Sequence, residues 1–94
     1  MAQSPQLRIQ RNSEALKAYG LSRSTYYARI ADGLIPAPFP LGERAVGQLE
    51  HETQAVISAM AAGFTKSELQ DLVASLVADR KSLALAIISE VNSH

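Results

Sequence analysis

Residues 16–34 read LKAYGLSRSTYYARIADGL, and this stretch decides the fold. Gly20 ends a first helix, because glycine adopts the left-handed backbone conformation at no steric cost. Ser22 then begins a second helix, since its hydroxyl can accept a hydrogen bond from a free N–H of the first turn. Two short helices joined by a Gly-Leu-Ser turn are typical of a helix-turn-helix.

The first helix is predicted from its cap and from its apolar spacing. Asn12 or Ser13 can cap its start. Its inward face comprises Ala15, Leu16 and Tyr19. Before it, residues 7–9 suggest a short extended entry, and residues 1–7 are expected to fray.

The second helix is predicted over residues 23–32 and ends at Gly33. Tyr26, Tyr27 and Ile30 give its buried side at helical spacing. Of the two tyrosines we favour Tyr26 for the core, because it lies one full turn before Ile30. The other tyrosine could then reach a phosphate with its hydroxyl.

A proline-rich segment follows the two helices. Residues 34–41, LIPAPFPL, form an extended edge segment, because prolines at alternate positions are incompatible with a helix and with a central strand. Gly42 and Glu43 form a turn, and residues 44–49 return as a strand. Together these segments predict a small hairpin, or wing, with Glu43 and Arg44 near its tip.

Two further helices are predicted in the second half of the chain. The first covers residues 50–62 and stops at Gly63. Its apolar face comprises Val56, Ile57 and Met60. The sequence Thr-Lys-Ser-Glu at residues 65–68 matches a capping box, which predicts the start of the last helix.

The last helix carries an apolar face that must be covered. Its apolar residues are Leu69, Leu72, Val73, Leu76, Val77, Leu83, Ile87, Ile88 and Val91. Asp79 and Arg80 interrupt this pattern. The face can fold back on its own domain or pair with the same helix in a second copy. We favour a homodimer through this C-terminal helix, because a domain of this size has a limited core.

These elements predict a mainly α fold: a winged helix-turn-helix with a small β-hairpin wing and a C-terminal helical extension. Residues 1–62 would form the winged helix-turn-helix domain. Residues 63–94 would form the extension and serve in dimerisation.

Composition narrows the class of protein. The chain has 94 residues, of which 47% are hydrophobic, so it is long enough for one folded domain. It has no cysteine, which excludes a disulfide framework, a thiolate zinc site and a cysteine nucleophile. We find no signal-peptide core, and no apolar run approaches the ~20 residues that span a membrane. We therefore expect a cytoplasmic protein.

The net charge is zero, but the charges are unevenly distributed. Residues 1–47 carry six basic and three acidic side chains, and residues 48–94 carry three basic and six acidic ones. The first half would therefore attract a polyanion and the second half would repel it.

Residues suited to catalysis are sparse. His51 and His94 lie far apart in the sequence. Glu50, His51 and Glu52 occupy consecutive helix positions that point in different directions, so they cannot ligate one metal ion and are expected to form a solvated helix start. The glycines lack a phosphate-binding context, and no serine has a His and carboxylate pair. We expect no enzyme activity, no cofactor, no metal site and no small-molecule ligand.

The first turn of the second helix carries short polar and cationic side chains: Ser22, Arg23, Ser24 and Thr25. In a helix-turn-helix this turn enters the major groove of DNA. Arg23 could pair with guanine O6 and N7, and Ser24 and Thr25 could meet bases or phosphates. Arg29 lies further along and would face the backbone. The same four residues would equally suit an ordinary capped helix in a bundle.

The order of residues extends this pattern. It comprises Gly20, Leu21, Ser22, Arg23, Ser24, Thr25, Tyr27, Ile30, Gly33, Pro36, Pro38 and the run LGERAVG at residues 41–47. This order, within about residues 7–62, resembles the AlpA family of phage and prophage regulators. Its members are small MerR-like winged helix-turn-helix proteins related in form to excisionases. They regulate integrase genes or act as directionality factors in the excision of integrated elements.

The resemblance implies roles for individual residues. Arg23, Ser24, Thr25 and Tyr27 would face DNA or position the recognition helix, and Arg44 in the wing would contact the backbone. Family members usually carry basic residues at two positions that are Ala28 and Leu34 here, and tryptophans at two that are Gln48 and Val56. Fewer cations predict a weaker and less salt-sensitive grip on DNA.

We therefore expect a sequence-specific regulator of transcription that binds double-stranded DNA with the recognition helix in the major groove and the wing on the backbone. The DNA-binding residues would be Ser22, Arg23, Ser24, Thr25, Tyr27, Arg29 and Arg44. An excisionase needs the same contacts and stays an alternative. The third hypothesis is a protein-interaction module with a degenerate helix-turn-helix, which is motivated by the zero net charge, Ala28 and Leu34.

Overall fold

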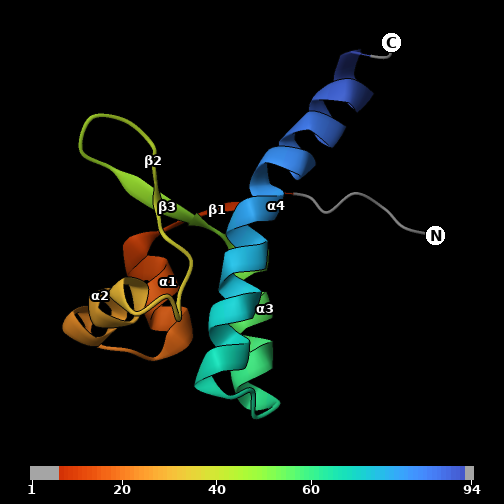
Figure 1. Cartoon of the computed structure of the whole chain (residues 1–94). Coiled ribbons are helices and arrows are strands. Elements are labelled where there is room, and N and C mark those ends of the chain that lie inside the picture. Colours follow the sequence, from red (N-terminus) through yellow and green to blue (C-terminus); the bar gives the residue numbers. More distant parts are fainter. Residues whose placement is uncertain (1–6, 93–94) are drawn as a thin grey trace.

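The computed structural model describes residues 7–92, which form four helices and a three-stranded antiparallel sheet (Figure 1). In chain order the elements are β1 (Ile9–Arg11), α1 (Asn12–Tyr19), α2 (Arg23–Ala31), β2 (Phe39–Pro40), β3 (Val46–Leu49), α3 (Glu50–Ala61) and α4 (Lys66–Asn92). This arrangement confirms the mainly helical, winged helix-turn-helix class. Of the residues 1–7 that were expected to fray, residues 1–6 lie outside the described residues, as does His94.

The turn between α1 and α2 forms as the sequence predicts. Gly20 has a φ of +70°, and the Leu21 N–H donates to the carbonyl oxygen of Leu16 at 3.0 Å, which closes the end of α1. Ser22 caps α2, because its Oγ accepts a hydrogen bond from the Thr25 N–H at 3.3 Å. The two helices are therefore set by local signals.

The start of α1 differs from the prediction. Its N-cap is Arg11, whose N–H donates to Glu14 Oε1 at 3.2 Å, so Asn12 or Ser13 as the cap is wrong. The Asn12 side chain instead makes hydrogen bonds to two tyrosine hydroxyls of α2. The Asn12 side chain therefore bonds to residues of α2 instead of capping its own helix.

The wing forms from β2 and β3, as predicted. The two strands pair antiparallel, and the Leu41 N–H donates to the Ala45 carbonyl oxygen at 2.7 Å next to the turn. Glu43 and Arg44 are exposed in that turn. β1 pairs with the other edge of β3, so the sheet has a third strand that was not predicted; the extended entry expected over residues 7–9 shares only Ile9 with it.

The core has two clusters of buried side chains that meet at Tyr19. Under the helix-turn-helix the buried residues are Ala15, Tyr26 and Ile35. Between α3 and α4 the buried residues are Val56, Ala59, Leu69 and Val73. Tyr19 packs against both clusters, so α4 and the helix-turn-helix share one continuous core.

Helix α4 is covered along only part of its length. Its first half packs against α3, and its second half extends past the rest of the molecule (Figure 1). Leu85, Ile88 and Val91 are 59%, 53% and 69% exposed. Folding back is therefore correct for the first half. Pairing with a second copy and the division into residues 1–62 and 63–94 stay predictions.

Candidate nucleic-acid interface

Helix α2 presents a low outer ridge to solvent. Successive residues are rotated by about 100°, so Ser24 and Ala28 lie opposite Tyr26 and Ile30. Tyr26 is fully buried and Ile30 is half-buried, whereas Ser24 and Ala28 are exposed. Because the exposed ridge consists of small side chains, this helix can approach another surface closely.

Cationic side chains lie on both flanks of this ridge. On one flank, Arg23 stacks over the ring of Tyr27, with its Cζ 5.8 Å from the ring centroid. On the other flank lie Thr25 and Arg29, one turn apart. The two arginines can therefore reach in different directions from one helix.

Tyr27 lies at the surface and not on the buried side of α2. It is 41% exposed, and its ring packs edge-on against Tyr26 with centroids 5.3 Å apart. Its hydroxyl accepts a hydrogen bond from Asn12 Nδ2 at 3.1 Å. The choice of Tyr26 for the core is confirmed, and the wider prediction that both tyrosines are buried is wrong for Tyr27.

A chain of hydrogen bonds connects the wing to α2. Gln48 Nε2 on β3 donates to the Tyr26 hydroxyl at 3.0 Å, and that hydroxyl donates to Asn12 Oδ1 at 2.9 Å. The Nδ2 group of the same Asn12 side chain donates a hydrogen bond to the Tyr27 hydroxyl. Burial raises the pKa of Tyr26, although the Gln48 hydrogen bond acts in the opposite direction. Sequence reasoning did not find this chain, because no local pattern marks Asn12 and Gln48 as partners.

Arg80 of α4 contacts both α3 and the segment that leads into the wing. Its Nη2 lies 2.7 Å from Glu52 Oε1 and its Nε lies 3.0 Å from Glu52 Oε2. Nη2 also donates to the Ala37 carbonyl oxygen at 3.0 Å, and Cζ lies 5.5 Å from the Phe39 ring centroid. One guanidinium therefore joins α4 to α3 and to the segment that leads into the wing.

The position of Glu52 corrects a prediction. Glu52 is 1% exposed, so the expected solvated start of this helix is wrong at that residue. The reason is Arg80, which supplies the counter-charge and two hydrogen-bonding nitrogens that a buried carboxylate needs. Arg80, which was expected to interrupt the apolar pattern of the last helix, forms the ion pair that joins α4 to α3.

Helix α4 also braces the end of α2. Gln70 Nε2 donates to the Asp32 carbonyl oxygen at 2.8 Å. Leu34, which follows α2, packs against the cluster between α3 and α4. A leucine at this position therefore contributes to the core instead of to a charged surface.

The seven predicted DNA-binding residues divide into two places. Six belong to the cap and helix of α2: Ser22, Arg23, Ser24, Thr25, Tyr27 and Arg29. Arg44 lies apart from them, in the exposed turn of the wing. Ser22 is occupied by the cap, because its Oγ contacts both the N–H and the hydroxyl of Thr25.

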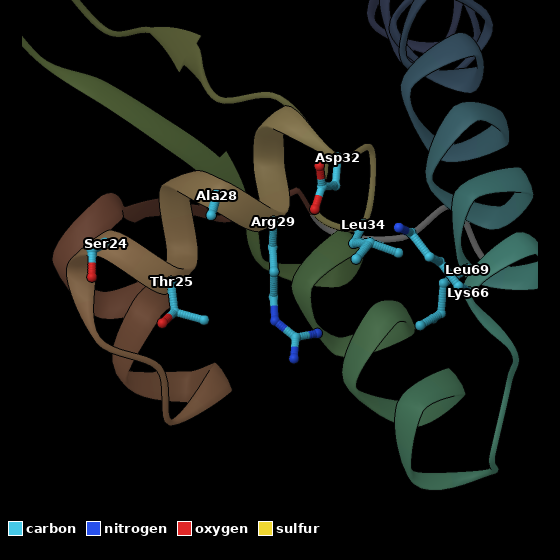
Figure 2. Close-up of a pocket in the computed structure, with 8 residues that line it drawn as sticks. All are labelled: Ser24, Thr25, Ala28, Arg29, Asp32, Leu34, Lys66 and Leu69. Carbon is cyan, nitrogen blue, oxygen red and sulfur yellow. The ribbon is translucent and has the colours of Figure 1, made fainter.

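A groove of about 680 Å³ lies beside α2 (Figure 2). Thr25 and Arg29 line it from α2, and Lys66 and Leu69 line it from the start of α4. Within residues 7–92, no three His, Cys, Asp or Glu side chains are grouped to hold a metal ion. No helix in the same span is long and apolar enough to cross a membrane.

Comparison with known proteins identifies one family. The model for the family described as "Prophage CP4-57 regulatory protein (AlpA)" matches residues 8–58, which is more than half of the chain. The match includes α1, α2 and the wing and ends before α4. No curated protein and no solved structure matches the chain.

Proposed function

Because this chain belongs to the AlpA family of prophage regulatory proteins, we propose that it regulates transcription by binding a specific sequence of double-stranded DNA. The observation that carries the proposal is the surface of α2, where a ridge of small side chains lies between two arginines. Such a ridge allows the helix to enter the major groove. The arginines then extend to either side of it.

Arg23 reads a base in this proposal. Its planar guanidinium donates two hydrogen bonds to guanine O6 and N7, a pairing worth about 1–3 kcal/mol of discrimination. The stacking on Tyr27 limits the motion of Arg23 before DNA arrives, which reduces the entropy lost on binding. Ser24 and Thr25 meet bases or phosphates from the same turn.

The remaining residues position α2 on the duplex. Tyr27 accepts a hydrogen bond from Asn12 and keeps its own proton to donate to a phosphate oxygen. Arg29 faces the DNA backbone on the opposite flank, and Arg44 at the wing tip contacts the backbone further along. Ser22 acts by capping the first turn and thereby fixing the side chains that follow it.

We also propose that residues 1–62 are the DNA-binding unit and that residues 63–94 brace it and form a homodimer. The stripe that buries Leu69 and Val73 continues past α3 as Ile87 and Val91. Residues 83–92 extend about 15 Å along the helix axis, long enough for nearly three turns of contact with a second copy. Two linked DNA-binding units raise the avidity for DNA of a protein that carries few cations.

The decisive experiment compares Arg23→Ala with wild type in a gel-shift assay on the operator, defined as the duplex that wild type selects from a random-sequence pool. Lys81→Ala is the matched control, because Lys81 is an exposed cation on α4. We expect Arg23→Ala to lose at least about tenfold in specific affinity with an unchanged circular dichroism spectrum. Unchanged binding would remove Arg23 from the interface. A wild-type protein that binds no duplex at low salt would instead favour the protein-interaction module.

A further inference from the structure

The groove between α2 and α4 is continuous with the proposed DNA-reading surface. Its α2 wall includes Thr25 and Arg29, which form one flank of the recognition helix. Figure 2 shows Arg29 extending from α2 and Lys66 reaching across from the start of α4, with Leu34 between them in this view. DNA that receives the ridge of α2 must therefore pass close to this groove.

The groove carries an excess of positive charge. Its lining contains two cations, Arg29 and Lys66, and one carboxylate, Asp32. Among the described residues neither cation forms an ion pair; the ion pair found there joins Arg80 to Glu52. Two cations that form no ion pair, set against one carboxylate, leave the groove with a net positive charge that favours an anion between its walls.

We propose that this groove holds the phosphate backbone of one DNA strand and that Lys66 contacts a phosphate there together with Arg29. The inference rests on the proposed function, since a helix in the major groove has a backbone on each side. Lys66 lies outside the matched residues 8–58, so family membership does not imply this role. Helix α4 thus becomes part of the DNA interface as well as its support.

Other features of the groove agree with a phosphate as the occupant. The two leucines in its lining are largely covered by the fold, because Leu69 is 7% exposed and Leu34 packs against the same cluster. At the N-terminus of α4 the Glu68 carboxylate already accepts a hydrogen bond from the Thr65 N–H at 2.9 Å, and the Glu68 N–H donates to Thr65 Oγ1 at 3.2 Å, so a second anion is disfavoured at the helix end. The binding group is therefore the Lys66 side chain and not the helix end.

The test measures the salt dependence of DNA binding by the full chain carrying Lys66→Gln. Anisotropy titrations of a labelled operator and of an unrelated duplex between about 50 and 200 mM salt give the slope of log K against log salt. Loss of one phosphate contact should lower the slope by about 1 on both duplexes equally. Lys66→Arg should keep the wild-type slope, and Lys81→Gln, which removes an exposed cation outside the groove, should leave it unchanged.

The outcomes separate this inference from the proposed function. If wild type binds DNA and Lys66→Gln keeps its slope and affinity, Lys66 makes no phosphate contact and the groove has another role. A loss confined to the operator would also overturn the inference, because a phosphate contact weakens all sequences alike. If wild type binds neither duplex, the proposed function itself fails. Lys66 is exposed, so unfolding curves should match wild type and exclude a folding defect.

Discussion

Gln48 Nε2 lies 3.0 Å from the hydroxyl oxygen of Tyr26, and this contact joins the central strand of the wing to the core face of α2. Both side chains are almost completely buried, so water cannot replace either partner. The same Nε2 donates to the Pro36 carbonyl oxygen at 2.6 Å. Because Tyr26 in turn binds Asn12, the wing and the outer surface of α2 are held in a fixed relation.

Gln48→Ala should therefore destabilise the protein. The change leaves the Pro36 carbonyl without its donor inside the core, a loss worth about 1–3 kcal/mol in the free energy of unfolding. Urea unfolding followed by circular dichroism measures it. Gln54→Ala is the control, since Gln54 is exposed on α3 and bonds only Glu50, at 3.4 Å. Equal unfolding midpoints for the two variants would show that the Gln48 amide contributes nothing to stability.

Gly47→Ala should disturb the sheet. A Cβ at Gly47 would lie 2.9 Å from the Gln10 carbonyl oxygen and 3.0 Å from Leu41 Cδ1, so β1 would have to move. We expect a loss of about 1–3 kcal/mol in thermal or urea unfolding, typical of overpacking. Gly42→Ala is the matched control, because a Cβ added there would meet no atom within 4 Å and the φ of Gly42 is not positive. A Gly47 variant as stable as the Gly42 variant would contradict the close approach of β1.

Arg80→Met should unfold more easily than Lys81→Met. The first change leaves Glu52, which is 1% exposed, as a buried carboxylate without its cation. Breaking a buried pair on one side costs about 3–5 kcal/mol, and we expect the lower end because the Arg80 side chain is 23% exposed. Lys81 is exposed, so its variant should unfold like wild type. Similar curves for the two would mean that Arg80 does not stabilise the fold.

Local signals explain which elements the sequence predicts correctly. Gly20, Ser22 and the Thr65–Glu68 capping box act within a few residues of one another, so they can be recognised without the fold. The small polar turn that begins α2 is equally local, and the surface exposure of Arg23 follows from it.

The features that sequence reasoning missed depend on contacts between distant segments. Gln48 and Tyr26 are separated by 22 positions, and Arg80 and Glu52 by 28. Neither pair has a periodic pattern that marks one residue as the partner of the other. The burial of Glu52 and the groove at Lys66 follow only once α4 is known to pack against α3.

The distal half of α4 leads to the last prediction. Ile88 is 53% exposed and widens the apolar stripe of Ile87 and Val91, since it lies about 60° from Val91 around the helix, whereas Ala86 is exposed about 200° from Ile88. Light scattering on wild type should give twice the 10.1 kDa mass of one chain. Ile88→Asp should give the mass of one chain, because a carboxylate on the stripe loses its solvation in the dimer. Ala86→Asp should keep the dimer. Wild type that remains a monomer at every concentration would contradict the homodimer. The wing and the Lys66 groove of one molecule would then supply the contacts to the DNA backbone that a second copy would otherwise add.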